Sequence, residues 1–316
     1  MNKKSSIVVI GGGTGTFTVL SGLKERKNIH LSAIVSMADD GGSTGILRKE
    51  PGILPPGAIR PALAALLRSK ERMAAFNFRF TDGIFKGHNV GNLLIYLFAR
   101  IYGDPQKAID EMERILQVKG EVIPSTFGDA KLYAKLENDG VIAGETNIDV
   151  PQHDGRLRIE DVWLDPPCTA NPKAIYAIKK AELIIIGPGD LFSSIVPNFL
   201  ANGIPQAIRE SRAKKIYVCN LMTKFGETHG FSAADFVEII EKYLGQDVLD
   251  LVILNKKKPP KDRITQYEKQ GAQFVSWKKE DFRSRKFTVV EENLLSKKGF
   301  IRHDPAALAN AILKLL

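Results

Sequence analysis

Two kinds of apolar pattern alternate along the chain. Short runs that are apolar throughout are typical of buried strands, and longer segments with apolar residues every three or four positions are typical of helices. The expected strands are 7–10, 31–37, 181–186, 214–220, 250–255 and 272–277, and the expected helices are 14–26, 90–102, 105–118, 232–245, 262–270 and 304–316. Fully apolar strands alternating with helices predict a Rossmann-like, doubly wound, mostly parallel α/β sheet.

The pattern changes between residues 120 and 165. Polar and apolar residues alternate over 131–148 on both sides of Asp139-Gly140, a dipeptide that favours a hairpin turn, and 156–164 is a candidate for a further strand. We therefore expect a small antiparallel β-rich insertion at 120–165 within one Rossmann-like nucleotide-binding domain that spans 1–316.

The composition suits a protein with a full core. Of the 316 residues, 44% are hydrophobic and 26% are charged, which is ordinary for a globular chain of this length. The segment VGNLLIYLFARIY at 90–102 is nearly all apolar, and this favours a helix buried in that core.

The sequence predicts a cytoplasmic protein without a membrane span. Cys168 and Cys219 are too few for a disulfide framework and are expected to be buried thiols in a reducing compartment. The first residues imitate a secretory signal, but the apolar run at 7–10 is too short for one. No stretch approaches the ~18 apolar residues that cross a bilayer.

The net charge of +9 favours anionic partners. Much of the excess lies in two basic runs, 255–263 and 277–286, of the kind that usually form solvated loops. Aromatic residues are not interleaved with these charges as a base-stacking platform requires, so nucleic acid is not an expected partner.

The glycine-rich stretch after the first strand is the first candidate site. Gly11, Gly12, Gly13, Thr14 and Gly15 join that strand to a helix, and such a turn brings backbone N–H groups and a helix N-terminus to an anion. The dinucleotide pattern G-x-G-x-x-G is met only in part, and no Lys-Ser/Thr pair marks a P-loop. Phosphate binding and a plain structural turn both remain open from these residues alone.

Three further polar stretches follow in the first third of the chain. Adjacent aspartates with hydroxyls after the second strand could share a divalent ion or orient a substrate hydroxyl, although turn capping is the simpler alternative. An arginine near a helix start could hold a phosphate, and polar residues that begin an apolar helix need partners. These residues are Asp39, Asp40, Ser43, Thr44, Arg60, His88, Asn89 and Asn92.

Later loops again follow buried strands. Ligands of open α/β sheets bind beyond the carboxyl ends of the strands, so we expect all these stretches to form one site. The later candidates are Gly187, Pro188, Gly189, Asp190, Ser193, Ser194, Asn220, Thr223, Lys224 and Arg302. No nucleophile-elbow motif, Cys/His metal spacing or H-E-x-x-H is present, which argues against a hydrolase or a zinc enzyme.

Taken together, the motifs resemble one family. GGGTG, ADDGGSTG, PPGAIR, GHNVGNLL, GPGDLFSSIVPN, NLMTKFGET and RHD occur in the order and spacing of the YvcK/CofD-like family, and most closely of its bacterial YvcK or gluconeogenesis-factor branch. The resemblance runs from about residue 7 to 310. It implies a Rossmann-like fold with a small β-rich insertion.

The resemblance implies two alternative functions. The CofD branch is a magnesium-dependent 2-phospho-L-lactate transferase that uses a guanosine diphosphate compound and a deazaflavin. The YvcK branch has similar loops, and resemblance to it implies a cytoplasmic UDP-sugar-binding regulator linked to gluconeogenic growth, cell shape and envelope synthesis. Where the family has an acid, an Asn, an Arg and a Ser, this chain has Ala58, Pro61, Ile46 and Asp190, and the first two disfavour metal-assisted transfer.

The expected function is therefore a nucleotide-sugar-binding regulator, with the transferase as the alternative. The ligand is expected to be a nucleotide diphosphate such as a UDP-sugar, GDP or an NAD-like compound, with the opening glycines and Arg302 on its diphosphate. No cofactor is required, and Mg²⁺ would sit on Asp39 and Asp40, which would also be the catalytic residues of a transferase. Expected partners are an unidentified regulatory protein and, on general grounds, a second copy in a homodimer.

Overall fold

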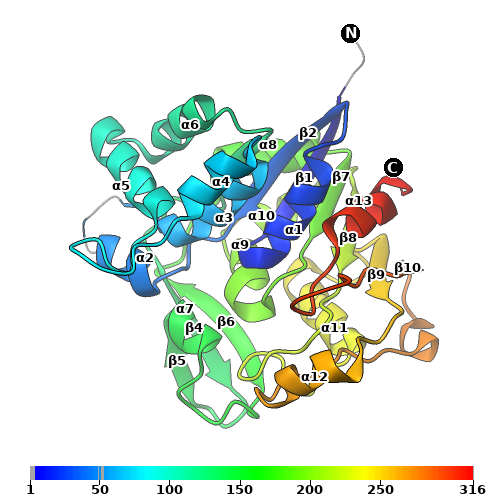
Figure 1. The fold of residues 1–316 in the computed structure, drawn as a ribbon. Coiled ribbons are helices and arrows are strands. Elements are labelled where there is room, and N and C mark those ends of the chain that lie inside the picture. Colours follow the sequence, from blue (N-terminus) through cyan, green and yellow to red (C-terminus); the bar gives the residue numbers. More distant parts are fainter. Residues whose placement is uncertain (1–3, 49, 51–52, 316) are drawn as a thin grey trace.

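A seven-stranded sheet forms the centre of the molecule (Figure 1). The computed structural model describes residues 4–48, 50 and 53–315, so Leu316 of the expected last helix lies outside the described residues. All six strand pairings are parallel. The spatial order is β10 (Thr288–Glu292), β9 (Leu251–Asn255), β8 (Lys214–Val218), β7 (Leu183–Ile186), β1 (Ser5–Gly11), β2 (Ile29–Val35) and β3 (Glu121–Pro124).

The strand order reverses between β1 and β7. From β1 the chain adds β2 and β3 on one side, and it later adds β7, β8, β9 and β10 on the other. The helices that follow β1 and β7 therefore cover opposite faces of the sheet, and a ligand crevice is expected at the carboxyl edge at this point. This geometry confirms the predicted doubly wound α/β fold and marks where a ligand would bind.

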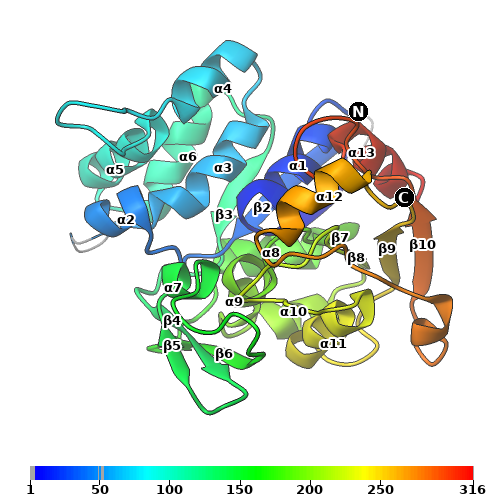
Figure 2. The same ribbon diagram turned by 60° about the horizontal axis from the view of Figure 1, so that its bottom comes forward.

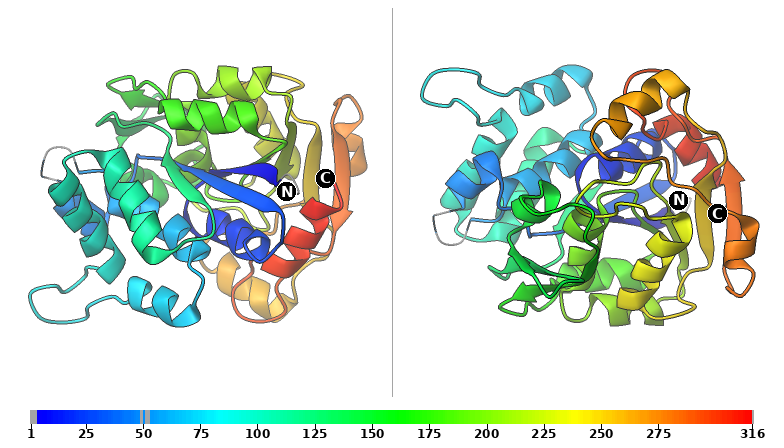
Figure 3. Two further views of the ribbon diagram at one scale, coloured as in Figure 1. Left: turned by 90° about the horizontal axis from the view of Figure 1, so that it is seen from above. Right: turned by 90° about the horizontal axis from the view of Figure 1, so that it is seen from below.

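Helices cover both faces of the sheet (Figure 3). Strand β1 shows why, because Ile7 and Val9 pack into one core cluster while Val8 and Ile10 pack into the other. The first cluster is covered by α1 (Gly13–Leu23), α3 (Pro56–Leu66), α4 (Lys70–Asn77), α5 (Val90–Tyr102), α6 (Pro105–Leu116) and α13 (Pro305–Leu313). The second is covered by α8 (Pro172–Lys180), η1 (Leu191–Ile195), α9 (Val196–Phe199), α10 (Ile204–Glu210), α11 (Ala233–Leu244) and η2 (Lys279–Phe282).

A separate antiparallel sheet stands beside the carboxyl edge (Figure 2). It consists of β5 (Val141–Ala143), β4 (Lys131–Leu136) and β6 (Ile159–Asp165), and the short helix α7 (Glu145–Asp149) follows β5. The expected hairpin is present between β4 and β5. The antiparallel part begins at Lys131 rather than at residue 120, because β3 pairs with β2 in the main sheet.

Several local expectations differ from the structure. Residues 272–277 are irregular apart from a bridge between Met222 and Phe274, and the last strand of the sheet is instead β10. Helix α12 (Lys261–Glu268) contains no buried residue and lies across the end of the sheet (Figure 2). A short helix that was not expected, α2 (Gly42–Leu47), follows β2. No helix among the described residues is long and apolar enough to cross a membrane.

Helix α5 has the expected bounds but not the expected burial. Only Gly91, Asn92 and Ile95 of its thirteen residues are buried. Leu97 and Ile101, one turn apart, are exposed to 48% and 64%. The helix packs on one side only, and its opposite side is apolar and open to solvent.

Candidate functional site

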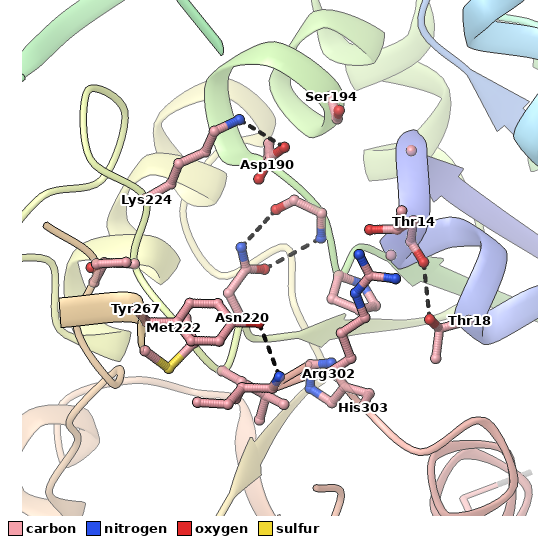
Figure 4. A pocket seen from close by; sticks show the side chains of 18 of the residues that line it. Thr14, Thr18, Asp190, Ser194, Asn220, Met222, Lys224, Tyr267, Arg302 and His303 are labelled. Carbon is pink, nitrogen blue, oxygen red and sulfur yellow. Dashed lines mark hydrogen bonds and ion pairs between the residues drawn. The ribbon is translucent and has the colours of Figure 1, made fainter. Parts of the chain in front are cut away.

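A cleft of about 350 Å³ opens at the point where the strand order reverses (Figure 4). Its walls come from the segments that follow β1, β7 and β8, from α12 and from the segment before α13. The lining residues are Gly12, Gly13, Thr14, Gly15, Thr18, Pro188, Gly189, Asp190, Ser194, Asn220, Leu221, Met222, Thr223, Lys224, Phe225, Tyr267, Gln270, Ala272, Ile301, Arg302 and His303.

The N-terminus of α1 faces this cleft. Gly12 precedes the helix, and no side chain accepts a hydrogen bond from its first turn, so those N–H groups are available to an anion. A Cβ on Gly15 would lie 2.0 Å from the carbonyl oxygen of Pro188, so the two loops approach this closely only with glycine at 15. On α1, Thr18 Oγ1 donates to the carbonyl of Thr14 at 2.9 Å.

The loop after β7 is held in place by the amide of Asn220. Asn220 Nδ2 donates to the carbonyl of Gly189 at 2.8 Å, and the backbone N–H of Gly189 donates to Asn220 Oδ1 at 3.3 Å (Figure 4). Because Asn220 follows β8, this pair ties the ends of two neighbouring strands together. The loop and the α1 terminus therefore form a firm base for the cleft.

The segment before α13 supplies the opposite wall. Arg302 is exposed, lies over the ring of Phe300 with its guanidinium carbon 5.1 Å from the centroid, and points toward the side of the cleft that carries Thr14 (Figure 4). The backbone N–H of Ile301 donates to the hydroxyl of Tyr267 at 2.9 Å, which places that ring in the wall. Burial lowers the pKa of His303 to about 4, so its imidazole is neutral at pH 7.

Lys224 joins the cleft to a group of three carboxylates. Its Nζ lies 3.0 Å from Asp190 Oδ2 and 3.1 Å from Glu227 Oε1, and it also pairs with Asp149 of α7. Burial opposes the charge of Lys224, but the carboxylates of Glu227, Asp190 and Asp149 outweigh it and raise the pKa of Lys224. The ammonium is therefore firmly charged and held among acids from three different segments.

Glu227 fixes the turn that begins η1. The backbone N–H groups of Phe192 and Ser193 donate to Glu227 Oε2 at 3.0 and 3.2 Å, and Ser193 Oγ donates to Oε1 at 2.9 Å. Burial raises the pKa of Glu227, Lys224 opposes this, and the net value is about 7. This buried carboxyl orders the loop that also carries Asp190.

A second polar group lies outside the cleft, beneath α2, α3 and α5. Asn92 Nδ2 donates to Ser43 Oγ at 3.0 Å, and Ser43 Oγ lies 2.9 Å from His88 Nδ1. Arg60 Nε donates to Asn92 Oδ1 at 3.1 Å, and Arg60 also donates to Asn77. These hydrogen bonds join α2, α3, α4 and α5.

The adjacent aspartates belong to this second group. The hydroxyl of Thr44 donates to Asp39 Oδ2 at 2.7 Å and the N–H of Gly41 donates to Oδ1 at 3.0 Å, while both N–H and hydroxyl of Thr146 donate to Asp40 Oδ1. Burial raises the pKa of Asp39. Three of the four carboxylate oxygens thus accept hydrogen bonds within the protein, and Asp40 Oδ2 accepts none from the described residues, so this pair offers Mg²⁺ one oxygen without such a bond.

The other acidic positions do not improve the fit to a metal. Ala58, where the resemblance to the family implies an acid, packs against the apolar core. Among the described residues, the three carboxylates close enough to share an ion are Asp149, Asp190 and Glu227, and the ammonium of Lys224 already contacts all three. We therefore assign no resident metal to either group.

Glu145 of α7 lies near both groups. Burial raises its pKa to about 9, and the charges of Asp39, Asp149 and Glu227 add to this shift. At neutral pH this carboxyl is protonated. The short helix α7 thus connects the antiparallel sheet to the cleft through Asp149 and to the second polar group through Thr146.

The structure divides the predicted site residues into three sets. Three of them, Gly11, Gly187 and Ser193, lie behind the cleft wall and do not line it. Those that line it are Gly12, Gly13, Thr14, Gly15, Pro188, Gly189, Asp190, Ser194, Asn220, Thr223, Lys224 and Arg302. Those in or beside the second polar group are Asp39, Asp40, Ser43, Thr44, Arg60, His88, Asn89 and Asn92.

Several residues of the cleft were not predicted. Thr18 stands one helical turn after Thr14 and could have been found from that spacing. Glu227 lies within the motif NLMTKFGET but was not singled out. His303 follows Arg302 within the motif RHD but was not named as a candidate either. Tyr267 and Asp149, which lies beside the cleft, come from segments whose sequences give no sign of this position.

Comparison with known proteins identifies the family. The family model described as 2-phospho-L-lactate transferase CofD matches residues 7–295. The gluconeogenesis factor of Bacillus subtilis is 38% identical over 100% of this chain and 99% of its own, and that of Listeria innocua is 37% identical over 99% and 96%. A crystal structure of a UPF0052 family member from Bacillus halodurans superposes with a TM-score of 0.92 at 35% identity and covers 99% of each chain. The chain therefore belongs to the CofD family and is similar over nearly its full length to bacterial gluconeogenesis factors.

Proposed function

We propose that the cleft binds a nucleotide diphosphate sugar, with a UDP-sugar as the leading candidate. One observation carries this proposal: the uncapped N-terminus of α1 and the guanidinium of Arg302 face the same cleft from opposite walls. A diphosphate between them would meet backbone N–H groups on one side and the guanidinium of Arg302 on the other. The ring of Tyr267 offers a flat surface for a base in the same cleft.

We further propose that the protein acts as a regulator that reports the level of this ligand, in a role connected with carbon metabolism and with cell shape and envelope synthesis. Relatives that match nearly the whole chain are named gluconeogenesis factors, which supports the link to carbon metabolism. The engaged state of Asp39 and Asp40 and the methyl group of Ala58 argue against the alternative, magnesium-dependent phospholactyl transfer.

Titration calorimetry tests the binding proposal. UDP-N-acetylglucosamine, UDP, GDP and NAD are titrated into the full chain, and we expect the UDP compounds to bind most tightly. Arg302→Ala should weaken binding by about 10- to 100-fold, because it removes a charge-assisted contact. The matched control is Arg283→Ala, because the guanidinium of Arg283 is exposed and pairs with Glu280 on the surface. Equal weakening by both variants would refute the assignment of Arg302.

The enzymatic alternative has its own assay. The chain is incubated with lactyl-diphosphoguanosine, a deazaflavin acceptor and Mg²⁺, and GMP is measured. We expect no GMP above background. Steady release of GMP would replace the regulator by a transferase, and failure of every nucleotide to bind would remove both functions.

A further inference from the structure

A hairpin at the rim of the cleft carries Arg302. The backbone N–H of Asp304 donates to the carbonyl of Leu294 at 2.7 Å. Closer to the turn, the N–H of Ser296 donates to the carbonyl of Arg302 at 2.9 Å. We call residues 294–304 the rim hairpin. Its pairing places Arg302 on the returning arm, between the turn and the start of α13.

The two ends of the rim hairpin are anchored in the fold, but its tip is exposed. Leu294 is buried, and its N–H donates to Asn255 Oδ1 at 3.0 Å. Asp304 caps the N-terminus of α13 with its side chain. Residues 297–300 at the tip are all exposed, and the exposed fraction of Phe300 is 67%. The tip therefore gains little from apolar burial and needs another source of order.

An arginine of α12 supplies this order. Arg263 Nη1 donates to the carbonyl of Ser296 at 2.8 Å. Its Nε donates to the carbonyl of Gly299 at 3.1 Å, and its Nη2 donates to that of Phe300 at 2.7 Å. Three carbonyls of the turn thus converge on one guanidinium, whose five N–H groups form a rigid planar fork. An ammonium group has no such fork and could not hold the turn in the same geometry.

Helix α12 joins the rim hairpin through polar contacts. Tyr267 stands one helical turn after Arg263 and therefore on the same face of α12. Its hydroxyl accepts a hydrogen bond from the N–H of Ile301 at 2.9 Å. Arg263 does not line the cleft, and it forms no ion pair within the part of the chain that the structure describes. Its charge is therefore devoted to the turn of the rim hairpin.

The turn in turn supports the side chain of Arg302. The carbonyl of Phe300 is held by Arg263, and the guanidinium carbon of Arg302 lies 5.1 Å from the centroid of the Phe300 ring. The same guanidinium points toward the side of the cleft that carries Thr14 (Figure 4). A guanidinium that already rests on an aromatic ring loses less rotamer freedom when it meets an anion.

We propose that Arg263 and Phe300 are positioning residues for the phosphate contact of Arg302. This inference rests on the proposed function, in which Arg302 faces the diphosphate of the ligand. Arg263 holds the tip of the rim hairpin, the tip holds the ring of Phe300, and the ring orients the guanidinium of Arg302. Neither Arg263 nor Phe300 lines the cleft, so both act through Arg302. Without them the charge of Arg302 remains, but its side chain must be ordered when the ligand binds.

Titration calorimetry of the full chain with UDP tests the proposal. We expect Arg263→Ala to weaken binding by about 3- to 10-fold and Phe300→Ala by about 2- to 5-fold. Arg263→Lys keeps the charge without the planar fork, so it should weaken binding as much as Arg263→Ala does. The matched control is Arg209→Ala on α10, which should leave binding unchanged. Arg209 also donates from a helix to a backbone carbonyl, that of Leu244 at 2.9 Å, but it does not line the cleft or contact the rim hairpin.

The same substitutions in an Arg302→Ala background separate positioning from a general effect on the fold. There Arg263→Ala and Phe300→Ala should cause no further loss of affinity, because the group that they orient is gone. Circular dichroism checks that each variant is folded. Phe300→Ala alters an exposed side chain, so it keeps the test decisive if Arg263→Ala does not fold.

Two kinds of result overturn the proposal while UDP still binds to the wild-type chain, and both leave the proposed function standing. One is full affinity in Phe300→Ala, in Arg263→Ala or in Arg263→Lys. The other is an equal loss of affinity with and without the guanidinium of Arg302, because the two residues would then act on the fold and not through Arg302. A wild-type chain that binds no nucleotide overturns this inference and the proposed function together.

Discussion

Replacing Lys224 by methionine tests whether this one cation balances the charges of the three carboxylates beside the cleft. At an effective dielectric constant of about 20, each contact near 3 Å contributes about 5 kcal/mol of attraction before the cost of desolvation is subtracted. Nζ contacts Asp190, Glu227 and Asp149, and breaking a buried pair typically costs about 3–5 kcal/mol net. We expect Lys224→Met to lower the free energy of unfolding by that amount near pH 8.

The sign of the pH dependence follows from Glu227. Its folded pKa of about 7 is above the ordinary value of 4.5, and losing Lys224 raises it further, so the folded variant binds more protons than the unfolded chain. The free energy of unfolding of the variant therefore falls as pH rises above about 4.5. Its loss of stability relative to the wild type, which we call the deficit, should accordingly be smaller at about pH 5.5 than at about pH 8. Urea unfolding of both proteins at the two pH values measures the deficit directly.

The control substitution is Lys135→Met. Lys135 pairs with Asp139 on the exposed hairpin, and we expect no measurable change in the urea midpoint. The reasoning is refuted if Lys224→Met costs less than about 1 kcal/mol, the upper value of an exposed pair. It is also refuted if the deficit is the same at both pH values, because Glu227 would then not be the group that carries the unpaired charge.

Three further substitutions address the remaining parts of the site. Gly15→Ala should lower stability by about 1–3 kcal/mol in thermal denaturation, because its Cβ would lie 2.0 Å from the carbonyl oxygen of Pro188; an unchanged melting temperature would contradict this contact. Asn220→Ala removes both hydrogen bonds to Gly189, so it should lower the free energy of unfolding by about 1–3 kcal/mol and weaken nucleotide binding in calorimetry. Unchanged stability and binding would show that the loop after β7 is ordered without Asn220. The pKa of Glu145 is about 9 in the folded protein against an ordinary value of 4.5, so its contribution to stability falls as pH rises between these values. In urea unfolding at several pH values, Glu145→Gln should therefore reduce the fall of the free energy of unfolding with pH. An unchanged fall would mean that other groups cause it.

The fold could be predicted because strands that are apolar throughout occur only where helices cover both faces. Val8 and Ile10 face one core and Ile7 and Val9 the other, and the sequence pattern of β1 contains that fact directly. The glycine loop and the loop after β7 could be assigned to one cleft for a similar reason. Both follow buried parallel strands, and the carboxyl ends of parallel strands meet at the same edge.

The division of the site could not be predicted, because it depends on the order of the strands in space. The loop with Asp39 and Asp40 follows β2, which lies on the side of β1 away from β7 and β8. Its residues therefore reach α3 and α5 and not the cleft. Nothing in the local pattern of an apolar strand states which neighbour it will take.

The exposure of α5 was missed for a different reason. The apolar pattern of a helix indicates which face will be covered, but it does not indicate whether the same chain covers that face. Ile95 and Asn92 are buried within the chain, while Leu97 and Ile101 are not. In the same way, Tyr267 reaches the cleft only because α12 crosses the end of the sheet, and this placement depends on contacts far apart in the sequence.

The cleft has two electrostatically different ends, and this polarity bears on the ligand. At one end the α1 terminus and Arg302 offer positive charge without a nearby acid among the lining residues. At the other end Asp190 is held by Lys224, so its carboxylate keeps oxygens that can accept hydrogen bonds but repels phosphate less than a free acid would. A nucleotide diphosphate sugar has the same polarity, because its anionic centre is joined to groups rich in hydroxyls. Asp190, at a position where the resemblance implies a serine, is therefore compatible with a phosphate-binding cleft when it faces ribose or sugar hydroxyls.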